Sequence, residues 1–429
     1  MNRQLSVLGV IHSRLFGFLL LMVTAIVGVS CSDQAQVPEA VIVDWSSPAG
    51  AGSVSPNLSL DLDGVPILSW IKVSEDSVAL QYSRWDQTQW SEPVEVSRGS
   101  DWLVNRADFP SVVQLSESLW AAHWLVMTDP SVFAYDVVVG LSTDGGTTWN
   151  NSLTPHLDGT HTEHGFVSFF ADDKDVGLVW LDGRNMTGGS HTEHNPQSMK
   201  SDTGMTLRST KLTAEGTLFE SQIIDGLVCD CCQTDIAQTD DGAIVVFRNR
   251  TEGEHRDIYY SRMVDGNWSE SKPVASDEWV IAGCPVNGPS VAASAGRTAV
   301  AWYTEAKGYG QVKLAVSEKG SDTFKPALEI SSGDSVLGQV GLAATEDSGF
   351  IVSWMTFKGE TKGELRLGYL DGSGHFGPEV VATDIGFTRL AGLPQMVVFG
   401  DRVILSWTGG DKSNKSVQVV SLDTSLIIK

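Results

Sequence analysis

Basic residues are scarce in this chain of 429 residues. Lysine and arginine together number 29, against 53 aspartates and glutamates, which gives a formal net charge of −24 at pH 7. A surface this acidic repels nucleic acid and anionic lipid headgroups. We therefore expect no nucleic-acid partner, and a solvated acidic surface accounts for the charge without a basic partner.

Sequence signatures of several enzyme classes are also missing. The chain has no glycine-rich phosphate loop, no serine-hydrolase elbow, no His-Glu-x-x-His motif and no Cys-x-x-Cys-His haem attachment sequence. Beyond residue 29 it has no apolar run long enough for a membrane-spanning helix. The function must therefore be sought in the fold and in the residues that the fold brings together.

The start of the chain has the pattern of a targeting segment. Arg3 and Arg14 are followed by the apolar run 15–29, which leads to Cys31. This resembles a bacterial lipoprotein signal, in which the cysteine is lipidated and becomes the first residue. We expect a signal peptide over 1–30, lipidation at Cys31, a linker over 31–40 and a periplasmic or surface location, on the outer membrane. Ordinary cleavage or an uncleaved anchor is the alternative.

Residues 41–429 repeat with a period near fifty residues. Short apolar segments each end on an aromatic residue, at spacings of 54, 56, 67, 55, 52 and 53. The aromatics are Trp70, Trp124, Trp180, Phe247, Trp302, Trp354 and Trp407. This period predicts a single all-β domain, a seven-bladed β-propeller whose aromatics fill the wedges between blades. The strand predicted at 40–45 should pair with the last blade and close the ring.

One turn carries a family resemblance. The segment Ser142-Thr-Asp144-Gly-Gly146-Thr-Thr148-Trp149 resembles the Asp-box of sialidases and related BNR-repeat propellers. That box lies on the turn between the third and fourth strands of a blade, and its polar side chains tie the turn together. The resemblance implies the fold and not an activity. Sialidases resemble six-bladed propellers, so six blades is the alternative to the seven that the repeat predicts.

Polar and metal-binding residues gather in the loops that lead into the innermost strands. In a propeller these loops surround the mouth of the central channel, where residues distant in sequence converge. The candidates are Arg106, Asp108, His161, Glu163, His164, Cys229, Cys231, Cys232, Gln233, Cys284, Asn287 and Arg389. Arg184, His191 and His194 lie in the long insertion 182–204, which we expect to be a mobile loop able to cover the mouth.

Three of the five cysteines occur at Cys229, Cys231 and Cys232. Thiolates with imidazoles suit copper or zinc, so one interpretation is a metal site. Its candidate ligands are Cys229, Cys231, Cys232, Cys284, His161, His164, His191 and His194. On a strand, Cys229 and Cys231 would share a face and Cys232 would point away. The alternative is two disulfides, formed in the oxidising compartment that an exported chain reaches.

The sialidase resemblance implies a further possibility. Sialidases hold the substrate carboxylate with three arginines, and they use a tyrosine nucleophile activated by glutamate together with an aspartate acid/base. Arg106 stands where the family's Arg-Ile-Pro motif would be, although the sequence reads Arg-Ala-Asp-Phe-Pro. The resemblance implies catalytic roles for Arg106, Asp108 and Arg389. Further candidates are Arg184, Arg248 or Arg250, and Tyr259 or Tyr303 with Glu305.

Three hypotheses about function follow. The first is a monomeric cell-envelope protein that binds a small molecule, a glycan or a soft metal ion at the channel mouth, with Asn287, Arg184 and Gln233 as ligand-binding residues. The second is a glycoside hydrolase of exo-sialidase type. The third is a non-catalytic scaffold for partner proteins. The sequence leaves open whether the protein is an enzyme.

Overall fold

The computed structural model describes residues 43–129, 133–149, 151–186, 204–359, 362–386, 392–411 and 414–428. The predicted signal peptide, Cys31 and the linker lie outside these ranges, so they stay predictions. Regular structure in the described part consists of strands and one short 3-10 helix, Thr424–Leu426. Among the described residues, no helix has the length and apolar character that a membrane span requires.

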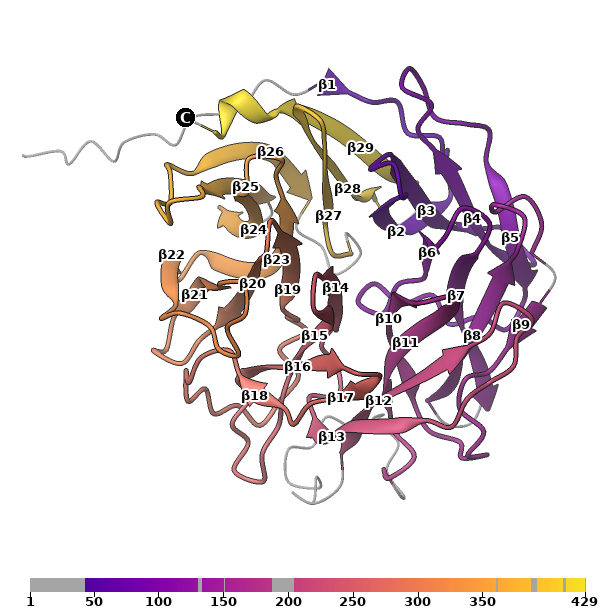
Figure 1. The fold of residues 1–429 in the computed structure, drawn as a ribbon. Helices are drawn as coiled ribbons and strands as arrows, with labels where there is room; N and C mark the ends of the chain where they lie inside the picture. Colours follow the sequence, from indigo (N-terminus) through magenta and orange to yellow (C-terminus); the bar gives the residue numbers. More distant parts are fainter. Residues whose placement is uncertain are drawn as a thin grey trace, which may run out of the picture. The chain divides into compact units, whose positions relative to one another are not determined.

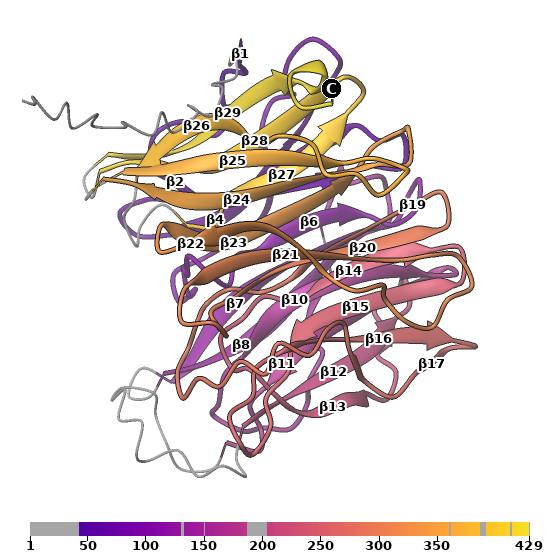
Figure 2. The same ribbon diagram turned by 90° about the vertical axis from the view of Figure 1, so that its left-hand side faces the viewer.

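The strands form antiparallel sheets arranged around a central axis (Figure 1), one sheet for each predicted repeat. Blades 1 to 3 are β2 (Ser53–Leu60), β3 (Pro66–Val73), β4 (Val78–Arg84) and β5 (Val94–Gly99); β6 (Ser111–Gln114), β7 (Trp120–Asp129), β8 (Ala134–Ser142) and β9 (Asn151–Leu153); and β10 (His164–Asp172), β11 (Asp175–Asp182), β12 (Met205–Leu212) and β13 (Gln222–Val228). In the view turned by 90° (Figure 2), the strands run from one face of the ring to the other.

Blade 4 has a fourth strand in two pieces, β17 and β18, which both pair with β16. Blades 4 to 6 are β14 (Asp235–Thr239), β15 (Gly242–Arg248), β16 (Ile258–Val264), β17 (Asn267–Trp268) and β18 (Lys272–Pro273); β19 (Ser290–Ser294), β20 (Arg297–Thr304), β21 (Gly310–Ser317) and β22 (Leu328–Gly333); and β23 (Val336–Ala344), β24 (Phe350–Lys358), β25 (Lys362–Leu370) and β26 (Val380–Gly386).

Both ends of the propeller domain meet in blade 7. This sheet has the order β1-β29-β28-β27, with β1 at Val43–Asp44, β27 at Gln395–Phe399, β28 at Arg402–Gly410 and β29 at Lys415–Asp423. Val43 pairs with Ser421 and Asp44 with Val420, so the N-terminal strand supplies the outermost strand of the last blade. The seven-bladed ring and its closure are confirmed, and the six-bladed alternative is wrong.

The repeated aromatics lie between blades, as predicted. Trp354 of blade 6 belongs to a buried cluster with Ala301 and Tyr303 of blade 5. Trp70 of blade 1 packs in the same way with Ile404 of blade 7. Each of the seven buried clusters joins two neighbouring blades and contains the aromatic of one of them. Because the indoles of Trp354 and Trp70 are at most 1% exposed, truncating either to alanine would cost roughly 3–5 kcal/mol.

The Asp-box lies on the turn between β8 and β9, where the resemblance placed it. Asp144 Oδ1 accepts hydrogen bonds from the Thr148 amide at 2.9 Å and the Ser142 hydroxyl at 2.8 Å. The Gly145 amide donates to the Ser118 carbonyl, on the turn between β6 and β7, at 3.0 Å. The box therefore occupies the face opposite the loops that lead into the innermost strands, and its polar side chains bond within the turn.

Candidate functional site

A pocket of about 410 Å³ opens among the mouth loops of blades 2 to 5. Its wall includes Arg106 before β6, Tyr135 at the start of β8, Glu163 before β10, Cys231 before β14 and Cys284 before β19. Segments far apart in the sequence thus meet at one site. We call it the mouth pocket.

The thiols gather at this pocket. Cys229, Cys231 and Cys232 form the turn between β13 and β14, and their Sγ atoms all lie within 4.8 Å of one another. Cys229 Sγ is 3.2 Å from Cys232 Sγ and 3.9 Å from Cys231 Sγ. The strand-like alternation predicted for these residues is wrong. The segment turns instead of extending, and the turn brings Cys232 to the same side as the other two.

Cys284 comes to the same pocket from the loop before β19. It is exposed and lines the mouth pocket beside Cys231, outside the group of three Sγ atoms that the turn brings together. Cys229 and Cys232 are at most 2% exposed. The four cysteines, all present as free thiols, thus lie at one site with a buried side and a side open to the pocket. We call them the thiol cluster.

Buried arginines surround the thiol cluster. Arg256 Nη1 donates to Cys229 Sγ at 3.2 Å, and Arg250 Nη1 pairs with Asp230 Oδ2 at 3.2 Å. Glu254 holds both guanidinium groups, at 2.8 Å from Arg256 and 2.7 Å from Arg250. Burial raises the pKa of the Cys229 thiol, but hydrogen bonds from the other two thiols of the turn and the charge of Arg256 bring it well below its ordinary value. Cys229 is therefore the thiol that the site favours as a thiolate, whereas hydrogen bonds to Cys229 and Cys232 raise the pKa of Cys231, and burial raises the pKa of Cys232.

Acidic groups lie at the mouth pocket, where Glu163 and Asp230 line the wall and Asp108 is buried behind it. The Tyr135 hydroxyl donates to Glu163 Oε2 at 3.4 Å. Burial, reinforced by the charge of Asp230, raises the pKa of Glu163 to about 8. Burial also raises the pKa of Asp108 to about 7, although hydrogen bonds from the Phe166 amide and Tyr135 oppose it. Tyr135 was missed in the sequence because it follows the loop between β7 and β8, and only loops leading into innermost strands were considered.

Asp108 and Asn287 have backbone partners in the next blade. Asp108 Oδ1 accepts the Phe166 amide at 2.8 Å, and Asn287 Oδ1 accepts the Gln339 amide at 2.6 Å. Phe166 and Gln339 have φ of 56° and 54°, and they interrupt the pairing of β10 and β23. These side chains thus hold bulges that would otherwise leave a buried amide without a partner.

Gln233 connects two mouth loops at the central channel. Its Nε2 donates to the Ala107 carbonyl at 2.7 Å, and its Oε1 accepts the Gly288 amide at 3.2 Å. It also lines the channel, a cavity of about 340 Å³ between the innermost strands. Its amide therefore bridges blades 2 and 5.

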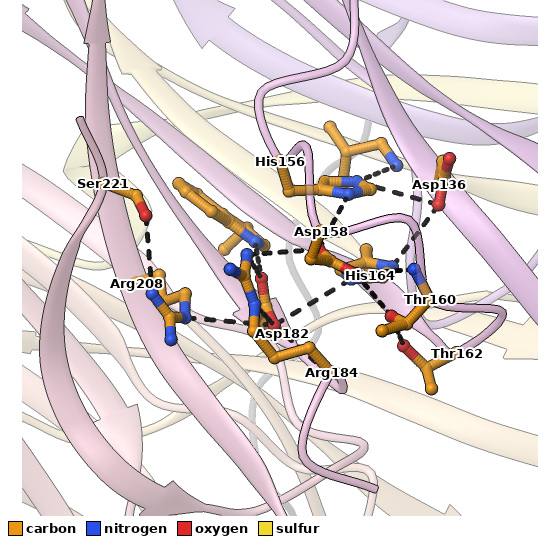
Figure 3. Close-up of polar contacts among 12 residues, drawn as sticks. Asp136, His156, Asp158, Thr160, Thr162, His164, Asp182, Arg184, Arg208 and Ser221 are labelled. Carbon is orange, nitrogen blue, oxygen red and sulfur yellow. Dashed lines mark hydrogen bonds and ion pairs between the residues drawn. The ribbon is translucent and has the colours of Figure 1, made fainter. Parts of the chain in front are cut away.

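His164 and Arg184 belong to a separate buried network (Figure 3). His164 Nε2 lies 3.2 Å from Asp158 Oδ2, and its Nδ1 lies 3.4 Å from Asp136 Oδ1. Arg184 binds Asp182 through Nε at 2.6 Å and Nη2 at 2.7 Å, and Asp158 at 3.2 Å. Among the described residues, the atom groups that could hold an ion contain either cysteines or these histidines and aspartates, and none contains both. Of the predicted imidazole ligands, His164 therefore lies in a cluster separate from the thiols.

Charge in the histidine network balances within the protein. The carboxylates of Asp158 and Asp182 lie near the guanidinium groups of Arg184 and Arg208, and that of Asp136 lies beside His164. Burial lowers the pKa of His164, but the nearby carboxylates of Asp136, Asp182 and Asp158 outweigh it and raise the pKa. The ring of His156 stacks on that of His164 at 3.7 Å, and its Nε2 accepts the Val137 amide at 3.2 Å. A proton on His164 would supply a third positive charge, and the same side chains form two groups, Asp136 with His156 and His164 and Asp158 with His164 and Asp182, whose atoms are close enough to hold an ion.

The remaining predicted residues are scattered or fall outside the described ranges. His191, His194 and Arg389 lie outside the described residues, as does most of the insertion 182–204. His161 is exposed and joins none of the three groups of the described chain that could hold a metal ion. The Tyr303 hydroxyl does hydrogen-bond to Glu305. Arg248 is buried and donates to the backbone carbonyls of Arg256, Asn287 and Tyr303. Several arginines were predicted for the site, and of those that the structure describes, Arg106 is the one that lines the mouth pocket.

Neither a protein-family model nor a curated protein matches the chain in sequence. Its structure is similar to solved glycan-active propellers. A PL25 ulvan lyase bound to -[GlcA(1-4)Rha3S]- has a TM-score of 0.56 at 12% identity, over 89% of this chain and 96% of that one. A Penicillium chrysogenum α-L-arabinanase has a TM-score of 0.46 at 12% identity, over 91% and 99%. A leech intramolecular trans-sialidase has a TM-score of 0.44 at 11% identity, over 84% and 83%.

These likenesses bear on architecture. The ulvan lyase is similar enough to show a shared propeller fold, whereas the other two fall below the similarity at which an argument can rest on them. The likeness to the ulvan lyase therefore supports the propeller architecture that the sequence repeat predicts, and it assigns no activity.

Proposed function

We propose that this propeller, exported and anchored at Cys31 as the sequence predicts, binds one soft metal ion, copper(I) or zinc, at the thiol cluster of its mouth pocket. The observation that carries the proposal is the cluster of three thiols from one turn, in a pocket that Cys284 from the next blade also lines. Thiolates are the ligands these ions prefer.

The spacing of the sulfur atoms supports a shared ion. With Zn–S bonds of about 2.3 Å, the sulfur atoms of a tetrahedral site lie about 3.8 Å apart. Cys229 and Cys231 Sγ are separated by 3.9 Å. Cys229 and Cys232 Sγ are closer, at 3.2 Å, but a disulfide requires about 2.05 Å. A small shift of the Cys232 side chain would bring its Sγ to tetrahedral spacing from Cys229, and Cys284 would have to move toward the three to complete the set.

The surrounding charge supports the same conclusion. Four thiolates around a divalent ion would leave two negative charges in a site with a buried side, which is costly unless they are paired. Arg256 already contacts Cys229, and Arg250 neutralises Asp230 beside it. Both guanidinium groups are at most 2% exposed. The protein therefore carries its counter-charges at the place where such a complex would form.

Metal content and thiol chemistry test this proposal. Untagged protein carrying Cys31→Ser, so that only the four cluster cysteines remain, should contain about one equivalent of copper or zinc. Cys231→Ser should lower metal affinity at least tenfold, as removal of a ligand does, while His161→Ala, an exposed residue outside the cluster, should leave it unchanged. Metal-free protein whose intact mass shows two disulfides would refute the proposal.

A second candidate function is chemistry on an acidic glycan in the same pocket. Its specific support is the Tyr135–Glu163 hydrogen bond in a pocket that Arg106 also lines. A phenol paired with a carboxyl group can transfer protons, and a guanidinium can bind a substrate carboxylate. The ulvan lyase of the same fold was solved with a glucuronate-containing ligand, which makes uronate polysaccharides the first substrate class to try.

Activity assays separate this candidate from the first. If it holds, the protein will release the fluorophore from a sialoside or generate unsaturated uronate from ulvan, and Tyr135→Phe will lower the rate at least a hundredfold. Tyr259→Phe, which changes a tyrosine outside the pocket, is the matched control and should retain activity. Absence of turnover on both substrates by metal-loaded protein would exclude it.

A further inference from the structure

Three tryptophans meet where blade 7 adjoins blade 1. Trp45 follows β1, while Trp85 and Trp90 flank the turn between β4 and β5. The rings of Trp45 and Trp85 stack with centroids 3.8 Å apart and an interplanar angle of 9°. Trp90 meets Trp85 edge-on at 5.4 Å and 75°. Because the β4–β5 turn joins a third strand to a fourth, as the Asp-box turn does, this group lies on the face opposite the mouth pocket.

These indoles line a second pocket, of about 640 Å³. Its wall also contains Phe399 and the polar side chains of Gln87, Gln89, Asp401 and Arg402. Trp85 and Trp90 are 8% and 9% exposed, whereas Trp45 is half-buried and keeps part of its ring accessible. An aromatic wall with a few polar groups around it is the usual make-up of a small-molecule site. We call it the tryptophan pocket.

The turn that carries the two glutamines is rigid. Asp86 Oδ1 accepts the Thr88 amide at 2.9 Å, the Thr88 hydroxyl at 2.8 Å and the Gln89 amide at 2.8 Å. Gln87 lies between them with φ of 80°, a left-handed conformation that normally favours glycine. Strain of this kind is concentrated at functional sites. The strained turn presents the two glutamines, both exposed, from a fixed backbone.

We propose that the tryptophan pocket binds a pyranose ring of a glycan chain, a second site independent of the mouth pocket. The electron-rich face of an indole attracts the C–H bonds on one face of such a ring. Amide side chains donate and accept hydrogen bonds, as ring hydroxyls require. Asp401 and Arg402 offer one charge of each sign, which cancel, so the pocket favours a neutral ligand over an ion. Arg402 is partly held by the Ser421 hydroxyl, 3.3 Å from Nη1.

The test uses two β-linked probes, chitotriose and cellotriose, with saturation-transfer NMR and tryptophan fluorescence titration. At least one probe should bind wild-type protein. Trp45→Ala should weaken binding at least tenfold and Gln89→Ala at least threefold. Trp102→Ala is the matched control, because Trp102 also stacks on a tryptophan, Trp124 at 5.2 Å, but lies outside the tryptophan pocket; it should bind as wild type.

Three results would overturn the proposal. The first is that neither trisaccharide binds wild-type protein. The second is that the Gln89→Ala and Trp45→Ala variants bind the sugar as tightly as wild type does. The third is that choline binds more tightly than both sugars, which would identify an aromatic cage for cations. If Trp45→Ala fails to fold, the Gln89→Ala measurement decides, because that side chain is exposed on the turn. Loss of metal binding or of enzyme activity at the mouth pocket would leave this outcome unaffected.

Discussion

Single buried side chains hold the mouth of this propeller in shape. Asp108 and Asn287 each accept the amide of a residue with positive φ in the next blade, and Gln233 links the loops of two blades. Removing such an acceptor would leave a buried amide unpaired, at a cost of about 1–3 kcal/mol. These residues belong to the framework around the mouth pocket, whereas Tyr135 lines the pocket and Arg256 contacts the Cys229 thiol.

The buried histidine of blade 2 makes a prediction about pH. Burial lowers the pKa of His123 to about 3 from an ordinary 6.5. Between these two pH values the unfolded chain therefore binds one more proton than the folded chain. The contribution of His123 to the free energy of unfolding is thus largest above pH 6.5 and decreases as the pH falls. His123→Asn, which can still bond to the Ser111 hydroxyl now 2.9 Å from Nδ1, should remove this dependence.

Urea unfolding at pH 7 and pH 5 measures the difference. Wild type should lose roughly 2 kcal/mol more unfolding free energy than the variant over this interval. Equal losses in the two proteins would show that His123 titrates in the folded state.

At the scale of elements, the strand repeat was predictable and the cysteine turn was not. Each blade carries an aromatic residue at the same register because that side chain fills the wedge between neighbouring blades. Its recurrence about every fifty residues therefore marks the blades. Cys229 to Cys232 was read as a strand because it immediately precedes β14, yet it is the turn before that strand. The spacing of the cysteines is compatible with a strand and with a turn, so it does not predict whether Cys232 faces Cys229. The backbone conformation decides that.

Closure by β1 gives a prediction at this scale. A chain that begins at Ser46 lacks β1 and the Trp45 ring that stacks on Trp85. Losing a packed indole and an edge strand should destabilise the propeller by roughly 3 kcal/mol. A chain that begins at Val43 keeps both and is the matched control. Thermal unfolding should show a lower midpoint for the shorter chain alone, and equal midpoints would mean that the ring does not depend on this strand.

At the scale of the whole molecule, the two faces of the ring carry different chemistry. Thiols, arginines and acids meet in the mouth pocket, and tryptophans with amides meet on the opposite face. The blade repeat predicts that Arg106, Cys231 and Cys284 converge, because it places each of them in a loop that leads into an innermost strand, and these loops surround one mouth. It does not predict the separation of His164 from the thiols, since adjacent residues in the sequence, Glu163 and His164, face different clusters.

One measurement decides between a thiol-bound metal and disulfides at the mouth. X-ray absorption at the zinc or copper edge, on untagged protein as isolated, should show a first shell made of about four sulfur atoms near 2.3 Å if zinc is bound. A shell dominated by nitrogen or oxygen, or the absence of metal from protein whose four cluster cysteines are paired, would contradict a metal site built from Cys229, Cys231, Cys232 and Cys284.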